Sequence, residues 1–117
     1  MTTRETLQAY FSGLELKKDW QSFLADDMTF TSLTSPIRQV SGRAAYIEST
    51  KRFYSMITAM KVKELLVDGE RACALTHYDL QPPGGQSFGS DVAEVFGVRA
   101  GKITSFDIYF DTAPYPK

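Results

Sequence analysis

The feature that most constrains the fold is the set of turn sequences that divides the second half of the chain. Asp68-Gly69, Pro82–Gly85 and Ala100-Gly101 each favour a reversal, because Gly adopts positive φ freely and Pro lacks a backbone donor. Between these turns the residues follow the alternation that is typical of strands. We therefore expect four consecutive antiparallel strands joined by hairpins, at residues 60–67, 71–80, 87–99 and 102–111.

The first third follows the 3.6-residue period of helices instead. Thr2 and Glu5 have the spacing of a capping box, so a first helix is expected to begin after Thr2. Asp19 is expected to cap a second, shorter helix. The apolar positions that the two helices would bury are Leu7, Tyr10, Phe11 and Leu14 in the first and Trp20, Phe23 and Leu24 in the second.

A mixed segment connects these helices to the hairpins. Residues 28–31 alternate and predict a short strand, whereas residues 35–39 are expected to form a loop, because Pro36 keeps its predecessor out of the helical region. Ser41-Gly42 begins a third helix, with an apolar stripe from Tyr46 to Ile57. Helices segregated from consecutive hairpins indicate an α+β fold, which we expect to form one domain over residues 1–117.

Composition excludes several classes of protein. Hydrophobic residues make up 43% of the 117, enough for a core, and 13 basic against 14 acidic residues argue against a nucleic-acid partner. One Cys and one His permit neither an internal disulfide nor a Cys/His zinc site, so no metal is expected. There is no apolar run of membrane-spanning length and no signal-like N-terminus, so we expect a cytoplasmic protein without a membrane partner.

Three local strings resemble a known superfamily. They are Leu-Ala-Asp-Asp-Met-Thr-Phe at 24–30, Gly-Arg-Ala-Ala-Tyr at 42–46 and Asp-Val-Ala-Glu-Val-Phe at 91–96, the last continuing through 101–103 to Tyr109-Phe110. Together with the element order, they resemble the nuclear-transport-factor-two-like superfamily, and within it the SnoaL-like polyketide cyclases and ketosteroid isomerases. The resemblance implies a cystatin-like cone, in which a curved antiparallel sheet wraps around N-terminal helices and leaves a conical cavity. It also implies that the chain forms a homodimer.

Which strand faces line that cavity matters for the site, because side chains alternate between the two faces of a sheet. On residues 71–80 the alternation alone leaves both faces open, and similarity to ketosteroid isomerases places Cys73, Leu75, His77 and Asp79 inward. On the next strand the matching set is Val92, Glu94, Phe96 and Val98. We expect an apolar ligand site lined by Phe30, Trp20, Tyr54, Leu75, Asp79, Phe96, Phe106, Ile108 and Phe110.

The resemblance also carries catalytic positions to this chain. Tyr10 matches the tyrosine of the ketosteroid isomerases, Glu94 matches the acid of their oxyanion pair, and the position of their base falls on Ser32. Because serine is not a carboxylate base, the standard isomerase mechanism is not expected. We instead expect cofactor-free acid/base chemistry with His77 as the proton carrier, Glu94 as its partner and Tyr10 as a hydrogen-bond donor.

Each of these residues also has a structural interpretation. A single strand histidine is more often a hydrogen-bonded structural residue, Glu94 can serve as an ion-pair partner, and Tyr10 belongs to an apolar helix stripe. Two further hypotheses are therefore a non-catalytic binder of an apolar ligand and an interaction module. The predicted outer sheet face has small or apolar residues at Ala93, Val95 and Gly97, which fits a homodimer.

Overall fold

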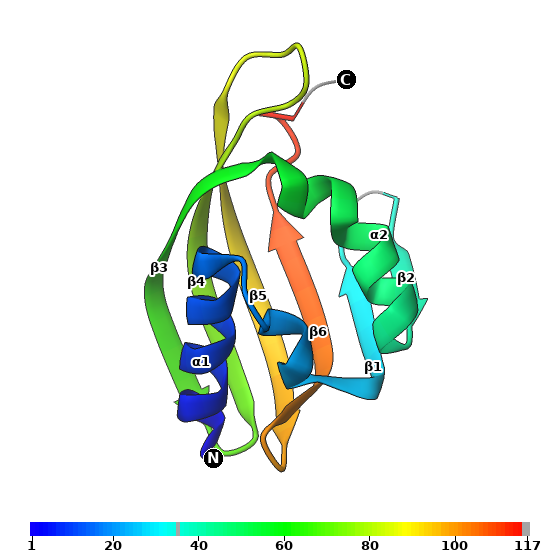
Figure 1. The fold of residues 1–117 in the computed structure, drawn as a ribbon, viewed down its shortest axis with the longest axis vertical. Coiled ribbons are helices and arrows are strands. Elements are labelled where there is room, and N and C mark those ends of the chain that lie inside the picture. Colours follow the sequence, from blue (N-terminus) through cyan, green and yellow to red (C-terminus); the bar gives the residue numbers. More distant parts are fainter. Residues whose placement is uncertain (35, 116–117) are drawn as a thin grey trace.

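The structure, a computed structural model, describes residues 1–34 and 36–115. Two α-helices, one short 3-10 helix and six strands follow one another along the chain (Figure 1). In order they are α1 (Thr3–Leu16), the 3-10 helix η1 (Trp20–Phe23), β1 (Leu24–Ser32), β2 (Arg38–Ser41), α2 (Arg43–Met56), β3 (Ile57–Asp68), β4 (Arg71–Leu80), β5 (Phe88–Arg99) and β6 (Lys102–Phe110).

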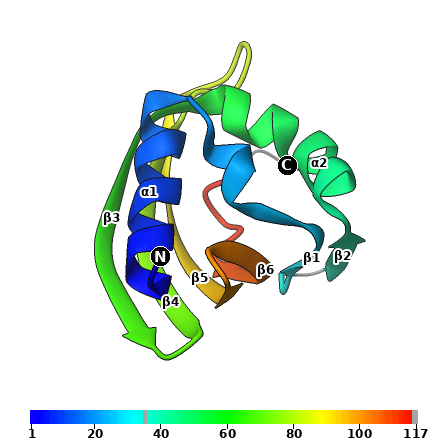
Figure 2. The same ribbon diagram turned by 60° about the horizontal axis from the view of Figure 1, so that its bottom comes forward.

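The six strands form one sheet in the order β2-β1-β6-β5-β4-β3. The sheet curves around the helices, with α1 against β3, β4 and β5 and with α2 against β1 and β2 (Figures 1 and 2). The predicted α+β cone is therefore confirmed. One detail differs, because β1 pairs with β6 in parallel while every other neighbouring pair is antiparallel.

The first helix forms as its sequence predicts. The Thr2 side chain accepts a hydrogen bond from the Glu5 backbone at 3.1 Å, and the Glu5 side chain accepts one from the Thr2 backbone at 2.9 Å. This capping box satisfies two backbone N–H groups that a helix start otherwise leaves unpaired. The helix buries the predicted stripe against the sheet, where the rings of Tyr10 and Phe11 pack on Phe96.

The segment between α1 and α2 departs from the sequence predictions. Residues 20–23 form only a 3-10 turn, and Asp19 makes no side-chain capping bond because its backbone is left-handed, with φ of 59°. Leu24 belongs to β1, which is much longer than the predicted strand at 28–31. The predicted loop is wrong from Arg38 onward, where β2 pairs with β1 in antiparallel register.

The hairpins of the second half lie where they were expected. β3 begins at Ile57 rather than at residue 60, directly after α2 ends at Met56. Ala100 and Gly101 both have positive φ, at 51° and 75°, which matches the twist of the strands that they connect. None of the helices within the described residues is long and apolar enough to cross a membrane.

Candidate functional site

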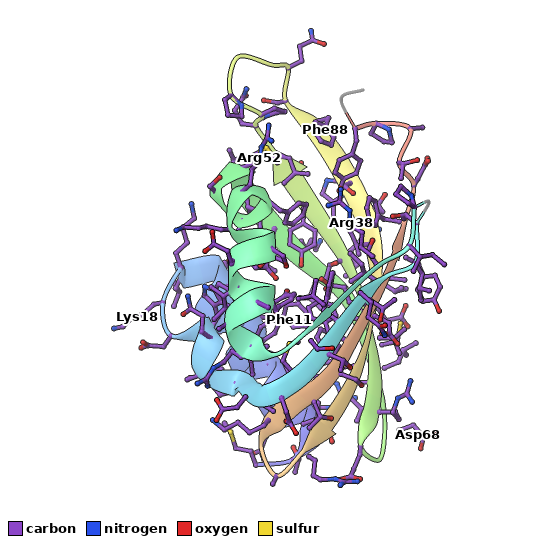
Figure 3. All side chains as sticks on the ribbon, turned by 90° about the vertical axis from the view of Figure 1, so that its right-hand side faces the viewer. Phe11, Lys18, Arg38, Arg52, Asp68 and Phe88 are labelled. Atoms are coloured by element: carbon purple, nitrogen blue, oxygen red, sulfur yellow. The ribbon has the colours of Figure 1, made fainter. Side chains whose placement is uncertain are left out.

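A cavity of about 180 Å³ lies between α2 and the concave face of the sheet. Its apolar walls come from strands that are far apart in sequence, with Phe30 on β1 and Phe106, Ile108 and Phe110 on β6. Because an apolar cavity of roughly 150 Å³ accepts a benzene molecule, this one has room for an aromatic ring. Figure 3 shows side chains of α2 and of the strands that project toward one another around this space.

Five of the residues predicted to contact a ligand line this cavity, namely Phe30, Tyr54, Phe106, Ile108 and Phe110. Two others pack elsewhere, Phe96 in the core and Trp20 against its edge. Phe96 is fully buried against Phe106 with ring centroids 4.5 Å apart, and Trp20 packs on Tyr54 at 4.9 Å. Neither is among the residues that line the cavity, so the prediction that they do is wrong.

Glu94 is the one acidic side chain that lines the cavity among the described residues, and it is only 4% exposed. Its Oε1 accepts a hydrogen bond from the Tyr78 hydroxyl at 2.8 Å, and its Oε2 accepts one from the Thr76 hydroxyl at 3.1 Å. Burial raises the pKa of Glu94 to about 7, and the two hydrogen bonds offset only part of that shift. Near neutral pH this carboxyl therefore exists in both protonation states.

Three tyrosines form a second polar group at the cavity. The hydroxyls of Tyr46 and Tyr54, both on α2, lie 2.5 Å apart, and the Tyr10 hydroxyl lies 3.5 Å from that of Tyr54. Tyr46 and Tyr54 line the cavity, whereas Tyr10 is fully buried behind them. Burial raises the pKa of all three, to about 12 for Tyr54, so these hydroxyls keep their protons and act as hydrogen-bond donors.

The rim of the cavity carries residues from β1, β2 and the C-terminal segment. Ser32, at the position of the isomerase base, is buried there and hydrogen-bonds the Thr34 hydroxyl at 3.1 Å. Arg38 lies opposite Ser32 in the β1–β2 register, and both line the cavity. Tyr115 closes another side, where its hydroxyl donates to Ser90 at 2.9 Å.

The expectation that His77 faces the cavity beside Glu94 is wrong. The His77 side chain is 35% exposed on the outer face of the sheet. Its Nδ1 lies 2.8 Å from Asp91 Oδ1, and its Nε2 lies 3.1 Å from Asp79 Oδ1. The two carboxylates raise the pKa of His77, with Asp91 contributing most. His77 is therefore an ion-paired surface residue, separated from Glu94 by the sheet.

His77 faces outward because of the register between β4 and β5. Glu94 pairs with Ala74 and Val92 pairs with Thr76, so the inward set of β4 is the alternative one that contains Thr76 and Tyr78. Leu75 and Asp79, predicted to contact a ligand, therefore lie on the outer face with His77. A shift of one residue moves every side chain of a strand to the opposite face. The inward set predicted for β5, with Glu94, is confirmed.

Sequence reasoning missed Tyr78 and Arg38 as residues of the site. Tyr78 was on the unchosen face of β4, where Tyr78 and Thr76 both offer hydroxyl donors to a buried acid on β5, whereas the chosen face offered the donor His77. Arg38 had no clear local signal, because Arg-Gln-Val-Ser at 38–41 contains a single apolar residue and follows soon after Pro36. Tyr46 was assigned to the apolar stripe of its helix without a role at the cavity.

A larger hollow of about 370 Å³ lies between α1 and β3. Its lining is about half polar, with Gln8, Glu15, Lys63 and Glu64, and no buried ionisable group faces it. Among residues 1–34 and 36–115 no cluster of His, Cys, Asp or Glu has the arrangement of a metal site. The cavity at Glu94 is thus the place where apolar walls and convergent polar groups occur together.

Comparison with known proteins places the chain in a family. A model of the SnoaL-like domain matches residues 7–106. Among solved structures, an NTF2-like protein from Burkholderia thailandensis is 18% identical with a TM-score of 0.84, over 97% of this chain and 94% of that chain. A Mesorhizobium loti protein described as a SnoaL-like polyketide cyclase is 20% identical with a TM-score of 0.77, over 93% and 99%.

TerC, crystallised with polyporic acid, is 18% identical with a TM-score of 0.78, over 94% of this chain and 92% of that chain. No curated protein matches the sequence. Because the structural relatives are all so distant in sequence, they support the fold alone, whereas the domain model covers most of the chain. On these grounds the chain belongs to the SnoaL-like domain family.

Proposed function

We propose that this protein binds a small aromatic carbonyl compound in the cavity and moves a proton on it, with Glu94 as the acid/base. The observation that carries the proposal is a buried carboxyl with a pKa of about 7 in the wall of an apolar cavity. A general acid/base works best when its pKa lies near the working pH. A buried group with that property is a candidate for catalysis.

The hydrogen bonds of Glu94 are compatible with both of its protonation states. The Thr76 hydroxyl lies 3.1 Å from Glu94 Oε2 and 3.3 Å from the Val92 carbonyl oxygen. It donates to the carboxylate when Glu94 is ionised, and to Val92 while accepting from Glu94 when the acid is protonated. Because a carboxylate offers about four acceptor positions, Tyr78 and Thr76 leave room for a proton from a ligand.

The tyrosines supply the hydrogen bond that stabilises the oxygen of the ligand while its proton is removed. Three hydroxyl hydrogens serve two hydrogen bonds among Tyr10, Tyr46 and Tyr54, so one hydrogen remains for a ligand oxygen. Since Tyr10 is enclosed behind Tyr54, the unused hydrogen belongs to Tyr46 or Tyr54, which line the cavity. It would stabilise the enolate oxygen that forms when Glu94 removes the proton from the adjacent carbon. Tyr10 is then a positioning residue rather than a donor to the ligand.

Hydrogen exchange on a generic ligand tests the proposal without knowledge of the natural substrate. 2-Tetralone in D2O gains deuterium next to its carbonyl slowly without a catalyst, and it does so faster if the protein removes and returns a proton there. We expect wild type to accelerate this exchange and Glu94→Gln to lower the rate by about 10²- to 10⁴-fold. Glu64→Gln, an exposed carboxylate on β3, is the matched control and should exchange like wild type.

Two outcomes would contradict or redirect the proposal. Equal rates for wild type and Glu94→Gln would remove Glu94 as the acid/base. Saturable binding of tetralone with exchange no faster than in the absence of protein would favour the second candidate, a non-catalytic binder. That candidate is supported by the fact that both Glu94 oxygens already have hydrogen-bond partners within the protein.

We also propose that a second copy of the chain covers the outer sheet face. Leu75 pairs with Ala93 and Cys73 with Val95 across β4 and β5, which gives this face a half-buried apolar centre that Asp107 borders beside Val95 on β6. Tyr109 on β6 extends the patch and is 51% exposed. Because a two-fold dimer brings the same patch of each copy together, an apolar face of this kind fits a homodimer.

A further inference from the structure

The cavity has different chemistry at its two ends. Glu94 lies at the inner end with its donors Thr76 and Tyr78, and Arg38 lies at the rim. In Figure 3 Arg38 is found between α2 and the strands, toward the end of the molecule where Phe88 also lies. A ligand that fills the space between these ends meets an acid on one side and a cation on the other.

The direction of Arg38 follows from strand register rather than from its own exposure. Arg38 is the Cα partner of Ser32, and Val40 is the partner of Phe30. Paired residues of antiparallel strands project to the same face, so Arg38 shares the face of two residues that line the cavity. An exposed edge-strand arginine would otherwise be expected to point into solvent.

The guanidinium is available to a ligand. Among the described residues Arg38 has no ion-pair partner, whereas Arg43 pairs with Asp26 at 2.6 Å and Arg99 with Glu70 at 3.7 Å. The serine and threonine of α2 at the cavity, Ser49 and Thr50, already donate to the Tyr46 carbonyl oxygen. Arg38 is therefore the strongest donor that the rim offers to an incoming group.

We infer that the ligand is an aromatic acid whose ring enters the cavity and whose carboxylate stays at the rim against Arg38. This inference rests on the proposed function, because it assumes that the cavity binds an aromatic compound. The orientation follows from charge, since an anion at the inner end would meet the buried Glu94 carboxyl. The cavity of about 180 Å³ has room for one aromatic ring, so a second fused ring and a substituent on it extend to the rim.

A matched pair of ligands tests the inference. 2-Naphthoate and 2-naphthamide have the same rings and similar shape, and differ in charge. We expect wild type to bind the naphthoate about tenfold more tightly than the amide, since a charge-assisted bond to Arg38 is absent from the amide complex. Arg38→Gln should abolish the preference and leave the affinity for the amide unchanged. Arg52→Gln, an exposed arginine of α2 that does not line the cavity, is the control and should keep the preference.

Salt provides a second readout of the same contact. The preference for the naphthoate should shrink as ionic strength rises, because the rim is open to solvent and its charges are screened. If both ligands bind equally, or if the preference survives in Arg38→Gln, the inference is wrong while binding in the cavity stands. If neither ligand binds wild type, the proposed function fails and the inference fails with it.

Discussion

At the scale of single residues, Glu94 links the cavity to stability. Its pKa is about 7 in the folded protein, against an ordinary value of 4.5. The unfolded chain therefore loses this proton from pH 4.5 upward, while the folded protein holds it until about pH 7. Stability falls as pH rises through that window, and the whole shift corresponds to about 3 kcal/mol.

We accordingly expect wild type to be less stable at pH 7.5 than at pH 5, as measured by urea unfolding. In Glu94→Gln most of this difference should disappear, because glutamine does not titrate. A smaller decrease should remain above pH 6.5, because the raised pKa of His77 stabilises the fold only while that ring is charged. Equal pH dependence in both proteins would show that Glu94 titrates normally.

His77 offers a second prediction at the residue scale. It is the one histidine of the sequence, so its imidazole resonance is unambiguous in an NMR titration. We expect a midpoint above 6.5 in wild type and a larger decrease in Asp91→Asn than in Asp79→Asn, because Asp91 raises the pKa most. A Cβ at Gly89 would lie 2.7 Å from His77 Cε1, so Gly89→Ala should displace the ring and also lower the midpoint.

The same titration identifies what would count against the ion-paired arrangement of His77. A midpoint that is identical in wild type and in all three variants would mean that neither carboxylate contacts the ring. The distances of 2.8 Å and 3.1 Å from the His77 ring to Asp91 and Asp79 predict the opposite result.

At the scale of helices and strands, sequence reasoning succeeded where a signal was local. The capping box at Thr2 and the turn at Ala100-Gly101 each depend on residues within a few positions of one another. The α1 stripe likewise followed from a period that one element contains, whereas the inward set of β5 came from the resemblance to ketosteroid isomerases. Pro36 was also a local signal. It predicted a loop, but it did not predict that residues 38–41 form a strand.

The errors arose where pairing with a distant strand decides the outcome. Both faces of β4 alternate acceptably, and only the pairing of Ala74 with Glu94 selects the inward one. The parallel pairing of Phe30 with Phe106 joins segments more than seventy residues apart and has no local signature. Glu94 was placed correctly by the resemblance. Its donors Tyr78 and Thr76 were not, because the face on which they lie depends on the pairing of β4 with β5.

At the scale of the whole molecule, the curved sheet separates the two roles that we propose. Its concave face holds the cavity, and its outer face carries the apolar patch around Val95, Leu75 and Tyr109. We expect light scattering after size exclusion to give twice the 13.1 kDa of the chain at micromolar concentration.

A charge at the centre of that patch should separate the copies. Val95→Lys is expected to give a monomer with the circular dichroism of wild type, because the side chain lies on the outer face and not in the core. Lys61→Glu, toward the edge on β3, is the control and should stay dimeric. A wild-type protein that elutes at the mass of one chain would contradict the dimer without affecting the cavity.

The central claim is that a carboxyl which titrates near neutrality faces the ligand space. The most direct measurement is the 13C NMR titration of the Glu94 side-chain carboxyl, assigned by its loss in Glu94→Gln, with and without saturating 2-tetralone. The account predicts a midpoint near pH 7 that moves when tetralone binds. A midpoint near the ordinary value of 4.5 that tetralone does not change would contradict it.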